Sequence, residues 1–242
     1  MPFLTKLRVS KLRNLDSVSL TPSPGFNLIY GKNGSGKTSL LEAIYLLGRG
    51  KTFRSSSKAP VIQNNADESV VFCELDDGET LGFSKLRQGE QKTHINGEKT
   101  ASRAELAQVL PLQILNADAF KILEGGPSVR RAYLDWGVFH VEQSFILHWR
   151  QAQRALQNRN SLLKNKIVNP AEVRPWTREL CQHAEKIDAF RNEHAIQLEN
   201  CLAEILENLL ILDNFSIHYF KGWDDEHKLE DILKSNIQRD VR

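Results

Sequence analysis

The chain has 242 residues, of which 40% are hydrophobic, enough for a sizeable core in one α/β domain or in a domain with a second lobe. Its three cysteines, Cys73, Cys181 and Cys201, form no C-x-x-C pair, which argues against a disulfide framework or a zinc site. The amino terminus has no signal-peptide hydrophobic segment, and no apolar run approaches the roughly 20 residues that a membrane-spanning helix needs, so we expect a soluble cytoplasmic protein without a membrane partner.

The net charge of +2 is unevenly distributed along the chain. Residues 1–60 carry ten Lys or Arg against two acidic side chains, a local charge of +8, whereas the other 182 residues carry 22 basic and 28 acidic side chains. A basic amino-terminal region suits a polyanion such as nucleic acid as well as a nucleotide. The alternative is that several of these cations only neutralise the nucleotide or solvate strand edges.

Three short strands are expected at the start of the chain. Thr5–Ser10 alternates polar and apolar side chains, which is typical of a half-buried strand, and a second strand is expected at Asp16–Leu20. A turn at Pro22–Gly25 then precedes the apolar run Phe26–Tyr30. This run predicts a buried strand.

Residues 31–38 read Gly-Lys-Asn-Gly-Ser-Gly-Lys-Thr and match the phosphate-binding pattern G-x-x-x-x-G-K-[ST] at every fixed position. The glycines let backbone N–H groups close around phosphate oxygens, Lys37 would reach the β and γ phosphates, and the Thr38 hydroxyl would ligate Mg2+. A helix is expected over Ser39–Leu47, with its N-terminal dipole facing the anion. A strand, a loop and a helix in this order favour a nucleotide site over a chance glycine-rich turn, so we predict that the chain binds ATP.

An antiparallel meander is expected after the loop helix. Asp-Gly, Gln-Gly and Asn-Gly pairs supply the turns between its short strands. The apolar run Pro111–Leu115 predicts one more brief strand. The predicted meander strands are Glu68–Leu75, Thr80–Leu86 and Lys92–Ile95.

The pattern becomes helical from Pro127 onward, with Gly126 as a suitable N-cap and Pro127 at the first helical position. Two long helices are predicted, at roughly Val141–Ile167 and Trp176–Leu212, with breaks at residues 168–170 and around Pro175. Apolar residues recur at threes and fours in the second helix. This stripe predicts an antiparallel helical hairpin, for which core packing is a simpler role than partner binding.

The last part of the chain predicts a strand at Phe215–Phe220 and a charged helix at Asp224–Arg239. Two runs, one near this end of the chain and one in the meander, are similar to ATPase motifs. Leu209–Asp213 has the apolar-then-Asp form of a magnesium-binding strand, but it continues a helical period and is interpreted as a helix end. Leu86–Glu90 resembles a Leu-Ser-Gly-Gly-Gln type signature, but it lacks the serine and lies in a predicted hairpin, so we interpret it as a turn.

Several segments along the chain match one known family. The most specific is Gly125–Gly137, and the others are Leu12–Leu15, Ser23–Asn27, Gly31–Ile44, Phe53–Ser55 and Arg174–Trp176. With these segments the chain resembles the amino-terminal region of the bacterial RecF family, and the resemblance extends through almost the whole chain. It implies an SMC-like ABC ATPase of DNA repair that clamps double-stranded DNA as an ATP-bound homodimer and helps to load recombinase at gaps with RecO and RecR.

The fold implied by this resemblance is α/β: a P-loop ABC-type ATPase head, called lobe I, with an antiparallel β meander and an inserted helical lobe II. The ATP-binding part of the head is expected over residues 1–126 and the helical lobe over 127–212. Residues 213–242 would end that lobe or return toward the head. Family members are longer, and their signature motif and Asp-rich magnesium strand lie beyond residue 242, so we expect an incomplete head in an amino-terminal fragment.

The resemblance also implies roles for single residues. Asn33–Ser39 would wrap the phosphates, and Arg13 and Asn14 would approach the base and ribose. A loop after the meander would contribute a polar ligand near Mg2+, for which Gln113, Asn116 and Asp118 remain open. No catalytic residue is expected in the chain, and Thr38 is its expected metal ligand. The nucleotide-binding candidates are Gly31, Lys32, Asn33, Gly34, Ser35, Gly36, Lys37, Thr38, Ser39, Arg13 and Asn14.

Other functions compete with this interpretation. A small-molecule or nucleotide kinase would need an acceptor site and an arginine-rich lid, for which Arg130 and Arg131 are candidates. A transporter subunit would need an apolar surface for a membrane partner, against which the polar helices argue. A helical module that binds a repair partner such as RecR is compatible with the RecF interpretation.

Overall fold

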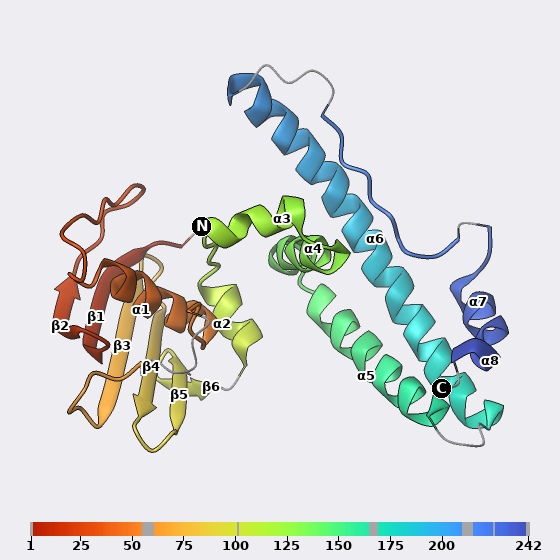
Figure 1. Cartoon of the computed structure of the whole chain (residues 1–242), viewed down its shortest axis with the longest axis horizontal. Coiled ribbons are helices and arrows are strands. Elements are labelled where there is room, and N and C mark those ends of the chain that lie inside the picture. Colours follow the sequence, from red (N-terminus) through yellow and green to blue (C-terminus); the bar gives the residue numbers. More distant parts are fainter. Residues whose placement is uncertain are drawn as a thin grey trace. The chain divides into compact units, whose positions relative to one another are not determined.

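The computed structural model describes residues 2–54, 61–100, 102–164, 169–209, 215–224 and 226–240. The chain divides into two compact units, Met1–Leu115 and Asn116–Arg242 (Figure 1). The first unit is a sheet with helices packed on it, and the second is made of helices and one extended segment. The expected functional boundaries after residues 126 and 212 remain predictions.

The first unit is built on one antiparallel sheet with strand order β2-β1-β3-β4-β5-β6. Alternation places one face of each strand in the core, as in β3, where Val71, Cys73 and Leu75 are buried and their neighbours are more exposed. The predicted meander is confirmed. The strands are β1 (Leu4–Leu12), β2 (Leu15–Leu20), β3 (Glu68–Leu75), β4 (Thr80–Leu86), β5 (Gln91–Ile95) and β6 (Glu98–Thr100).

The hairpin turns lie where the sequence predicts them. Gly78 and Gly89 adopt φ values of 87° and 100°, and the pair Asn96 and Gly97 adopts 52° and 83°, a conformation that favours Asn-Gly in two-residue hairpins. The backbone N–H of Gly89 donates to the carbonyl of Leu86. The signature lookalike at residues 86–90 is therefore a turn between β4 and β5, as expected.

Helix α1 (Lys37–Arg49) covers the sheet and closes the main core. Its buried residues Leu40, Ala43, Leu46 and Leu47 pack with apolar side chains of β1, β3 and β4. Helix α2 (Arg103–Val109) packs against α1. The predicted loop helix is thus confirmed, and it begins inside the phosphate loop at Lys37.

Two predicted strands of the first unit are wrong. Residues 26–30 have no regular secondary structure, and Phe26 and Tyr30 are 88% and 86% exposed. Residues 111–115 also form no strand, and Leu115 is 88% exposed. Among the described residues no strand pairs with either segment, and an apolar run needs a ladder partner before it becomes a strand.

The second unit is centred on an antiparallel hairpin of α5 and α6, which lie side by side (Figure 1). Val138 of α4, Phe145 and Ala152 of α5, and Ile187 of α6 form its core. The predicted hairpin is confirmed. The elements are η1 (Ala117–Phe120), α3 (Lys121–Glu124), α4 (Pro127–Val141), α5 (Phe145–Leu163), α6 (Pro170–Leu209), α7 (Leu229–Ser235) and α8 (Ile237–Asp240).

The start of α4 agrees with the sequence, but the next boundaries differ. Gly126 is the N-cap of α4 and Pro127 lies at its first position. The first long helix was expected from residue 141, whereas α4 ends at Val141 and α5 begins at Phe145. The Glu142 carboxylate separates them because it accepts hydrogen bonds from the backbone N–H of Ser144 at 2.9 Å and from its hydroxyl at 2.7 Å.

The predicted break at Pro175 is also wrong, because α6 passes through it. Asn169 starts the helix by accepting a hydrogen bond from the backbone N–H of Ala171 at 3.0 Å. Pro175 lies close to this end, where it removes one helical hydrogen bond. Burial of Val173 and Thr177 on either side offsets that loss.

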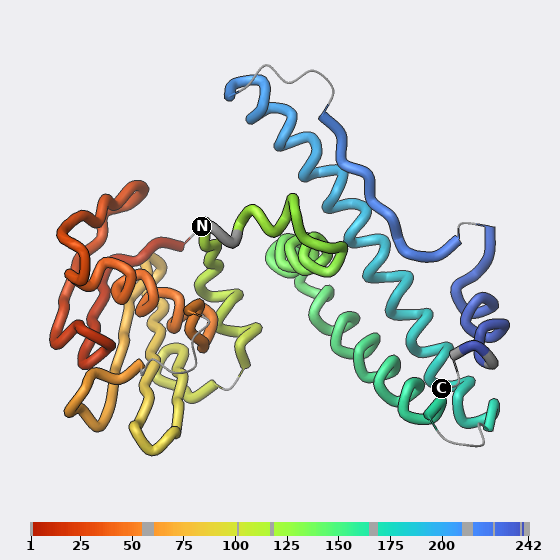
Figure 2. The backbone as a smooth tube through the Cα atoms, viewed as in Figure 1, coloured from red at the N-terminus to blue at the C-terminus, as the bar shows by residue number. Residues whose placement is uncertain are grey.

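The end of the chain contains less regular structure than expected. Residues 215–220 form no strand, and the final helix begins at Leu229 instead of residue 224. Figure 2 shows the extended segment that follows α6 running back along that helix. Helix α6 ends at Leu209, and the rest of the run 209–213 lies outside the described residues.

Candidate nucleotide-binding site

The phosphate loop is a tight turn that depends on glycine at three positions. Gly31, Gly34 and Gly36 have φ values of 145°, 82° and 97°, which side-chain-bearing residues rarely adopt. A methyl group on Gly36 would also lie 2.4 Å from Cδ2 of Leu15 on β2. Local conformation and close packing together explain these glycines.

Lys37 is turned back onto the loop. Its ammonium donates hydrogen bonds of 2.8 Å to the carbonyl oxygens of Gly31 and Lys32. The backbone N–H of Ser35 donates to the carbonyl of Lys32 at 3.2 Å, which closes the turn. A positive charge is thus held at the loop, where the phosphates of a nucleotide would bind.

The amino terminus of α1 offers donors to an anion. Gly36 is its N-cap, no side chain caps it, and its first turn carries no acidic residue. The first N–H groups of a helix have no partner within the helix, and the helix dipole adds positive potential there. Thr38 is exposed in this turn. Loop, cation and helix terminus therefore fit a nucleoside triphosphate.

Asn14 joins the loop to α1. Its side-chain amide donates to the carbonyl of Gly34 at 2.7 Å, and its Oδ1 accepts from the hydroxyl of Ser39 at 2.8 Å. Ser39 is 3% exposed. The structure thus brings both candidates to the loop as parts of its support, and their contact with the nucleotide stays a prediction.

Arg13 belongs to a buried charge network beside the loop. Its guanidinium pairs with both carboxylate oxygens of Glu42, with an Nη2–Oε1 distance of 2.7 Å. The Thr52 hydroxyl donates to the same carboxylate, and Nε of Arg54 lies 3.6 Å from it. Arg13 is therefore directed at α1, and its predicted approach to the base and ribose stays a prediction.

Glu42 is fully buried, and its ionisation reflects two opposing effects. Burial raises the pKa of the Glu42 carboxyl. The hydrogen bonds from Arg13 and Thr52 and the charges of Arg13 and Arg54 together lower it by more, so that the net pKa is below its usual value. No motif in the sequence marks this residue as part of the site. The available signal was a single carboxylate on the apolar face of the loop helix, where only a paired charge is tolerated.

The three candidates for a ligand near Mg2+ lie in two different units. Gln113 is exposed in the first unit. Asn116 and Asp118 belong to the second unit, and Asp118 is part of η1. The choice among them stays a prediction.

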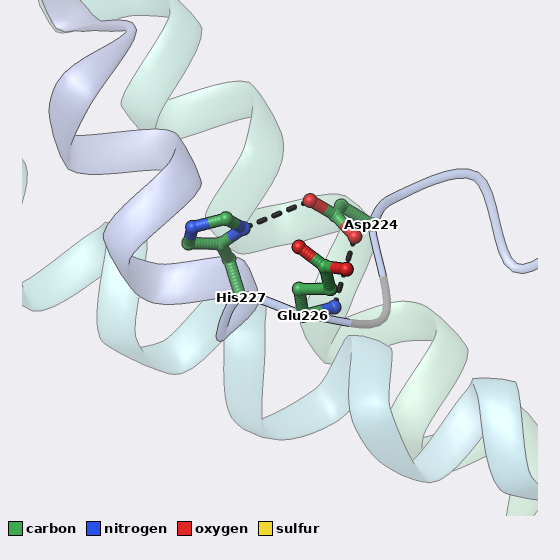
Figure 3. Close-up of side chains that lie close together, drawn as sticks. All are labelled: Asp224, Glu226 and His227. Atoms are coloured by element: carbon green, nitrogen blue, oxygen red, sulfur yellow. Dashed lines mark hydrogen bonds and ion pairs between the residues drawn. The ribbon is translucent and has the colours of Figure 1, made fainter.

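A group of potential metal ligands lies elsewhere, at Asp224, Glu226 and His227 (Figure 3). All three side chains are exposed. The Asp224 carboxylate accepts from the backbone N–H of Glu226 at 2.9 Å and contacts Nδ1 of His227 at 2.8 Å. These bonds make the group a turn that precedes α7, and we assign no ion to it.

Among the described residues, no helix combines the length and the apolar character needed to cross a membrane.

Residues 3–128 match the family model of the RecF/RecN/SMC N terminal domain. Over 241 residues the chain is 44% identical to the DNA replication and repair protein RecF of Pseudomonas syringae pv. syringae (strain B728a) and 45% identical to that of Pseudomonas putida (strain GB-1). Each alignment covers 98% of this chain and 66% of the relative. The chain thus spans just under two thirds of the length of these relatives.

The structure is also similar to solved structures of RecF in the RecFOR pathway. The RecF-ATPrS structure gives a TM-score of 0.84 and the RecF-ATP structure 0.80, each at 26% identity and covering 99% of this chain, with 69% and 68% of the solved chains covered. An Smc head domain from Pyrococcus furiosus, bound to the C-terminal domain of ScpA, gives 0.50 at 20% identity, covering 86% of this chain and 62% of that one, which shows the fold alone. The α/β ATPase-head fold is confirmed.

Proposed function

The chain belongs to the RecF family, and from that membership we propose that it is the ATP-binding portion of a DNA replication and repair protein. The observation that carries the proposal is the phosphate loop at residues 31–38, whose Lys37 and three positive-φ glycines form a phosphate cradle at the start of α1. The similarity to RecF structures with ATP and ATPrS supports the choice of ATP. The Thr38 hydroxyl would hold Mg2+, which neutralises charge on the phosphates.

Binding and hydrolysis are separate proposals for this chain. Hydrolysis requires an acidic residue that holds Mg2+ and a group that orients the attacking water. Glu42, the one acidic residue of α1, is held by Arg13 and Thr52. We therefore propose that the site is composite and that a second protomer in an ATP-dependent homodimer completes it.

Double-stranded DNA is the proposed macromolecular substrate, bound in an ATP-dependent manner in the cytoplasm. The local charge of +8 over residues 1–60 and the family membership support it. Cooperation with RecO and RecR in loading recombinase at gaps belongs to the same proposal, supported by the likeness to RecF of the RecFOR pathway.

Fluorescent ATP binding by the chain and by its Lys37→Met variant tests the nucleotide site. We expect the variant to lose most of the affinity, because the ammonium at the loop is removed. Lys99→Met is the matched control, because Lys99 is exposed on β6 and its substitution removes the same charge away from the loop. Equal loss in both variants, or none in Lys37→Met, would contradict the proposal.

Duplex DNA binding at low salt, with and without ATP and Mg2+, tests the second part. We expect ATP to strengthen binding by full-length RecF of Pseudomonas putida, and we expect added salt to weaken it. Absence of duplex binding by the full-length protein would contradict the DNA proposal and leave the nucleotide site unaffected.

A kinase remains the alternative, and one observation argues against it. Arg130, a candidate lid residue, donates to the carbonyl of Gly125 at 2.7 Å and thus supports the start of α4. A screen of phosphoryl acceptors distinguishes the two functions, since a RecF-type ATPase transfers phosphate to none of them.

A further inference from the structure

The second unit contains a cavity of about 760 Å3 that the proposed nucleotide function does not use. Its walls are α3, α4, α5, α6 and the extended segment 215–223. Figure 2 shows the backbone of this segment running along α6. The volume is in the range of sites that bind small molecules and peptide side chains, about 300–1,000 Å3. Every lining residue lies in this one unit.

The lining is apolar with a positive charge. Aliphatic side chains from three helices form much of the wall, including Leu134, Leu156, Leu180 and Ile187. Five large lining side chains are exposed: Leu123 at 77%, Phe220 at 86%, and Tyr133, Trp149 and Phe215 at 36–42%. Exposed apolar side chains gathered around one cavity are typical of an interaction site.

All of the charged residues that line the cavity are basic: Arg130, Arg131, Arg191 and Lys221. Arg191 is neutralised by Asp135, with Nε–Oδ1 at 2.6 Å, and Arg130 is bound to the Gly125 carbonyl. Arg131 makes no hydrogen bond or ion pair with any residue that the structure describes. It is exposed at the cavity and available to an anionic group.

Residues 215–223 form an extended wall of the cavity that makes no backbone–backbone hydrogen bond with the described part of the chain. Phe215, Ile217 and Tyr219 alternate with polar or exposed residues, the pattern that predicted a strand. Two side-chain contacts hold this segment to α6: the Tyr219 hydroxyl donates to Asp188 at 2.8 Å, and the Ile217 N–H donates to Glu199 at 3.2 Å. Within the described part of the chain, no backbone–backbone hydrogen bond reaches residues 215–223.

We propose that this cavity binds an extended acidic peptide of a protein partner, which adds as a strand to residues 215–221. Its backbone would pair with N–H and C=O groups of that segment other than the Ile217 N–H, which Glu199 already holds, and alternate apolar side chains would enter the cavity. Carboxylates of the peptide, next to the apolar side chains that enter the cavity, would form ion pairs with Arg131. This proposal does not depend on nucleotide binding.

The lining favours a peptide over single-stranded nucleic acid. Nucleic-acid grooves combine several free cations along a backbone with stacking platforms. Here Arg131 is the one lining cation without a partner among the described residues, and although aromatic residues such as Trp149 and Trp223 also line the cavity, aliphatic side chains of α4, α5 and α6 form much of its wall. An apolar side chain fills such a wall, whereas a phosphate would be desolvated against it.

Fluorescence anisotropy with a synthetic peptide of alternating Leu and Glu tests the proposal on the whole chain. We expect saturable binding that falls at least tenfold in Arg131→Glu and stays within twofold in Arg150→Glu, an exposed α5 arginine outside the lining that gives the same change of charge. Slower amide hydrogen exchange over residues 215–221 on peptide addition reports strand pairing directly.

Three results would overturn the proposal. One is equal binding of a peptide with Lys in place of Glu. The second is unchanged exchange at residues 215–221 in the bound state. The third is that an oligothymidylate displaces the peptide and that Arg131→Glu weakens binding of the oligothymidylate as much as it weakens binding of the peptide. That result would assign the surface to nucleic acid. Circular dichroism of each variant confirms that it is folded before binding is compared.

Discussion

At the scale of the residue, Glu42 connects the phosphate loop to the core of the first unit. It lies on the apolar face of α1, and its carboxylate accepts from Arg13 on the β1–β2 turn and from Thr52 after α1. Arg13 adopts φ 53°, so its backbone conformation is part of the same arrangement. A single buried carboxylate thereby fixes the positions of two loops around the candidate nucleotide site.

Glu42→Gln tests this network. This change removes the charge of the buried carboxylate that pairs with Arg13, whose side chain is only 9% exposed, and we expect the free energy of unfolding to fall by about 3–5 kcal/mol. Urea unfolding followed by circular dichroism measures the change. Glu90→Gln is the control, since Glu90 pairs with Lys92 at an exposed site and little change is expected.

The loop glycines allow two causes of strain to be separated. Gly36→Ala combines a positive φ with a contact to Leu15, whereas Gly78→Ala has a positive φ of 87° and no atom within 4 Å of the added methyl group. We expect Gly78→Ala to lower the free energy of unfolding by about 1–2 kcal/mol. Gly36→Ala should lower it more and also weaken fluorescent ATP binding. If the two variants lose equal stability, the contact with Leu15 is not the cause.

At the scale of the element, three apolar segments with strand-like patterns are not strands: residues 26–30, 111–115 and 215–220. The patterns describe which side chains can be buried, but a strand also requires a neighbouring backbone. Helices were predicted better than strands because their hydrogen bonds are local. The predicted break at Pro175 was the exception, since Asn169 fixes the start of α6 and the helix continues through Pro175. The meander strands were predicted correctly because each short turn places the next strand beside the one before it, where the two can pair.

Helices α5 and α6 are joined by a histidine pair that predicts acid sensitivity. Nδ1 of His148 lies 2.9 Å from Nδ1 of His183, so one ring must accept while the other donates. Burial lowers the pKa of His148, and the nearby charges of His183 and Lys186 lower it further. The folded state therefore binds fewer protons than the unfolded chain.

It follows that stability is fully present above the unfolded His pKa of about 6.5 and decreases as the pH falls through that value. Urea midpoints at pH 7.5 and pH 5.5 should differ less in His148→Gln than in the original chain. His227→Gln, which changes an exposed histidine, should retain the original difference. An unchanged difference in His148→Gln would contradict this assignment.

At the scale of the whole molecule, two units with different compositions share one chain. The first holds the phosphate loop and the segment 1–60 with its local charge of +8, and the second holds the hairpin and its apolar cavity. Similarity to RecF structures extends over 99% of the chain, so it includes both units. The proposed functions accordingly fall on different units, a nucleotide site on one and a peptide site on the other.

ATP turnover by the 242-residue chain should be negligible even where ATP binds. The described residues supply Lys37 and the loop, but the one carboxylate of α1, that of Glu42, is held by Arg13 and Thr52 and is not available to orient water. Phosphate release measured with saturating ATP and Mg2+ should not exceed that of Lys37→Met. Turnover that disappears in this variant would show that the chain contains a complete catalytic site.

The sequence by itself determined the phosphate loop, the loop helix, the hairpin turns and the amphipathic helices, because each depends on residues a few positions apart and on conformations that glycine, proline or a 3.6-residue period specifies. Only the tertiary structure decided that Glu42 is a buried anion held by Arg13 and Thr52. It also decided that, within the described segments, three apolar runs have no ladder partner and Arg131 is left free at a cavity. These features depend on partners distant in the chain, which no local pattern specifies.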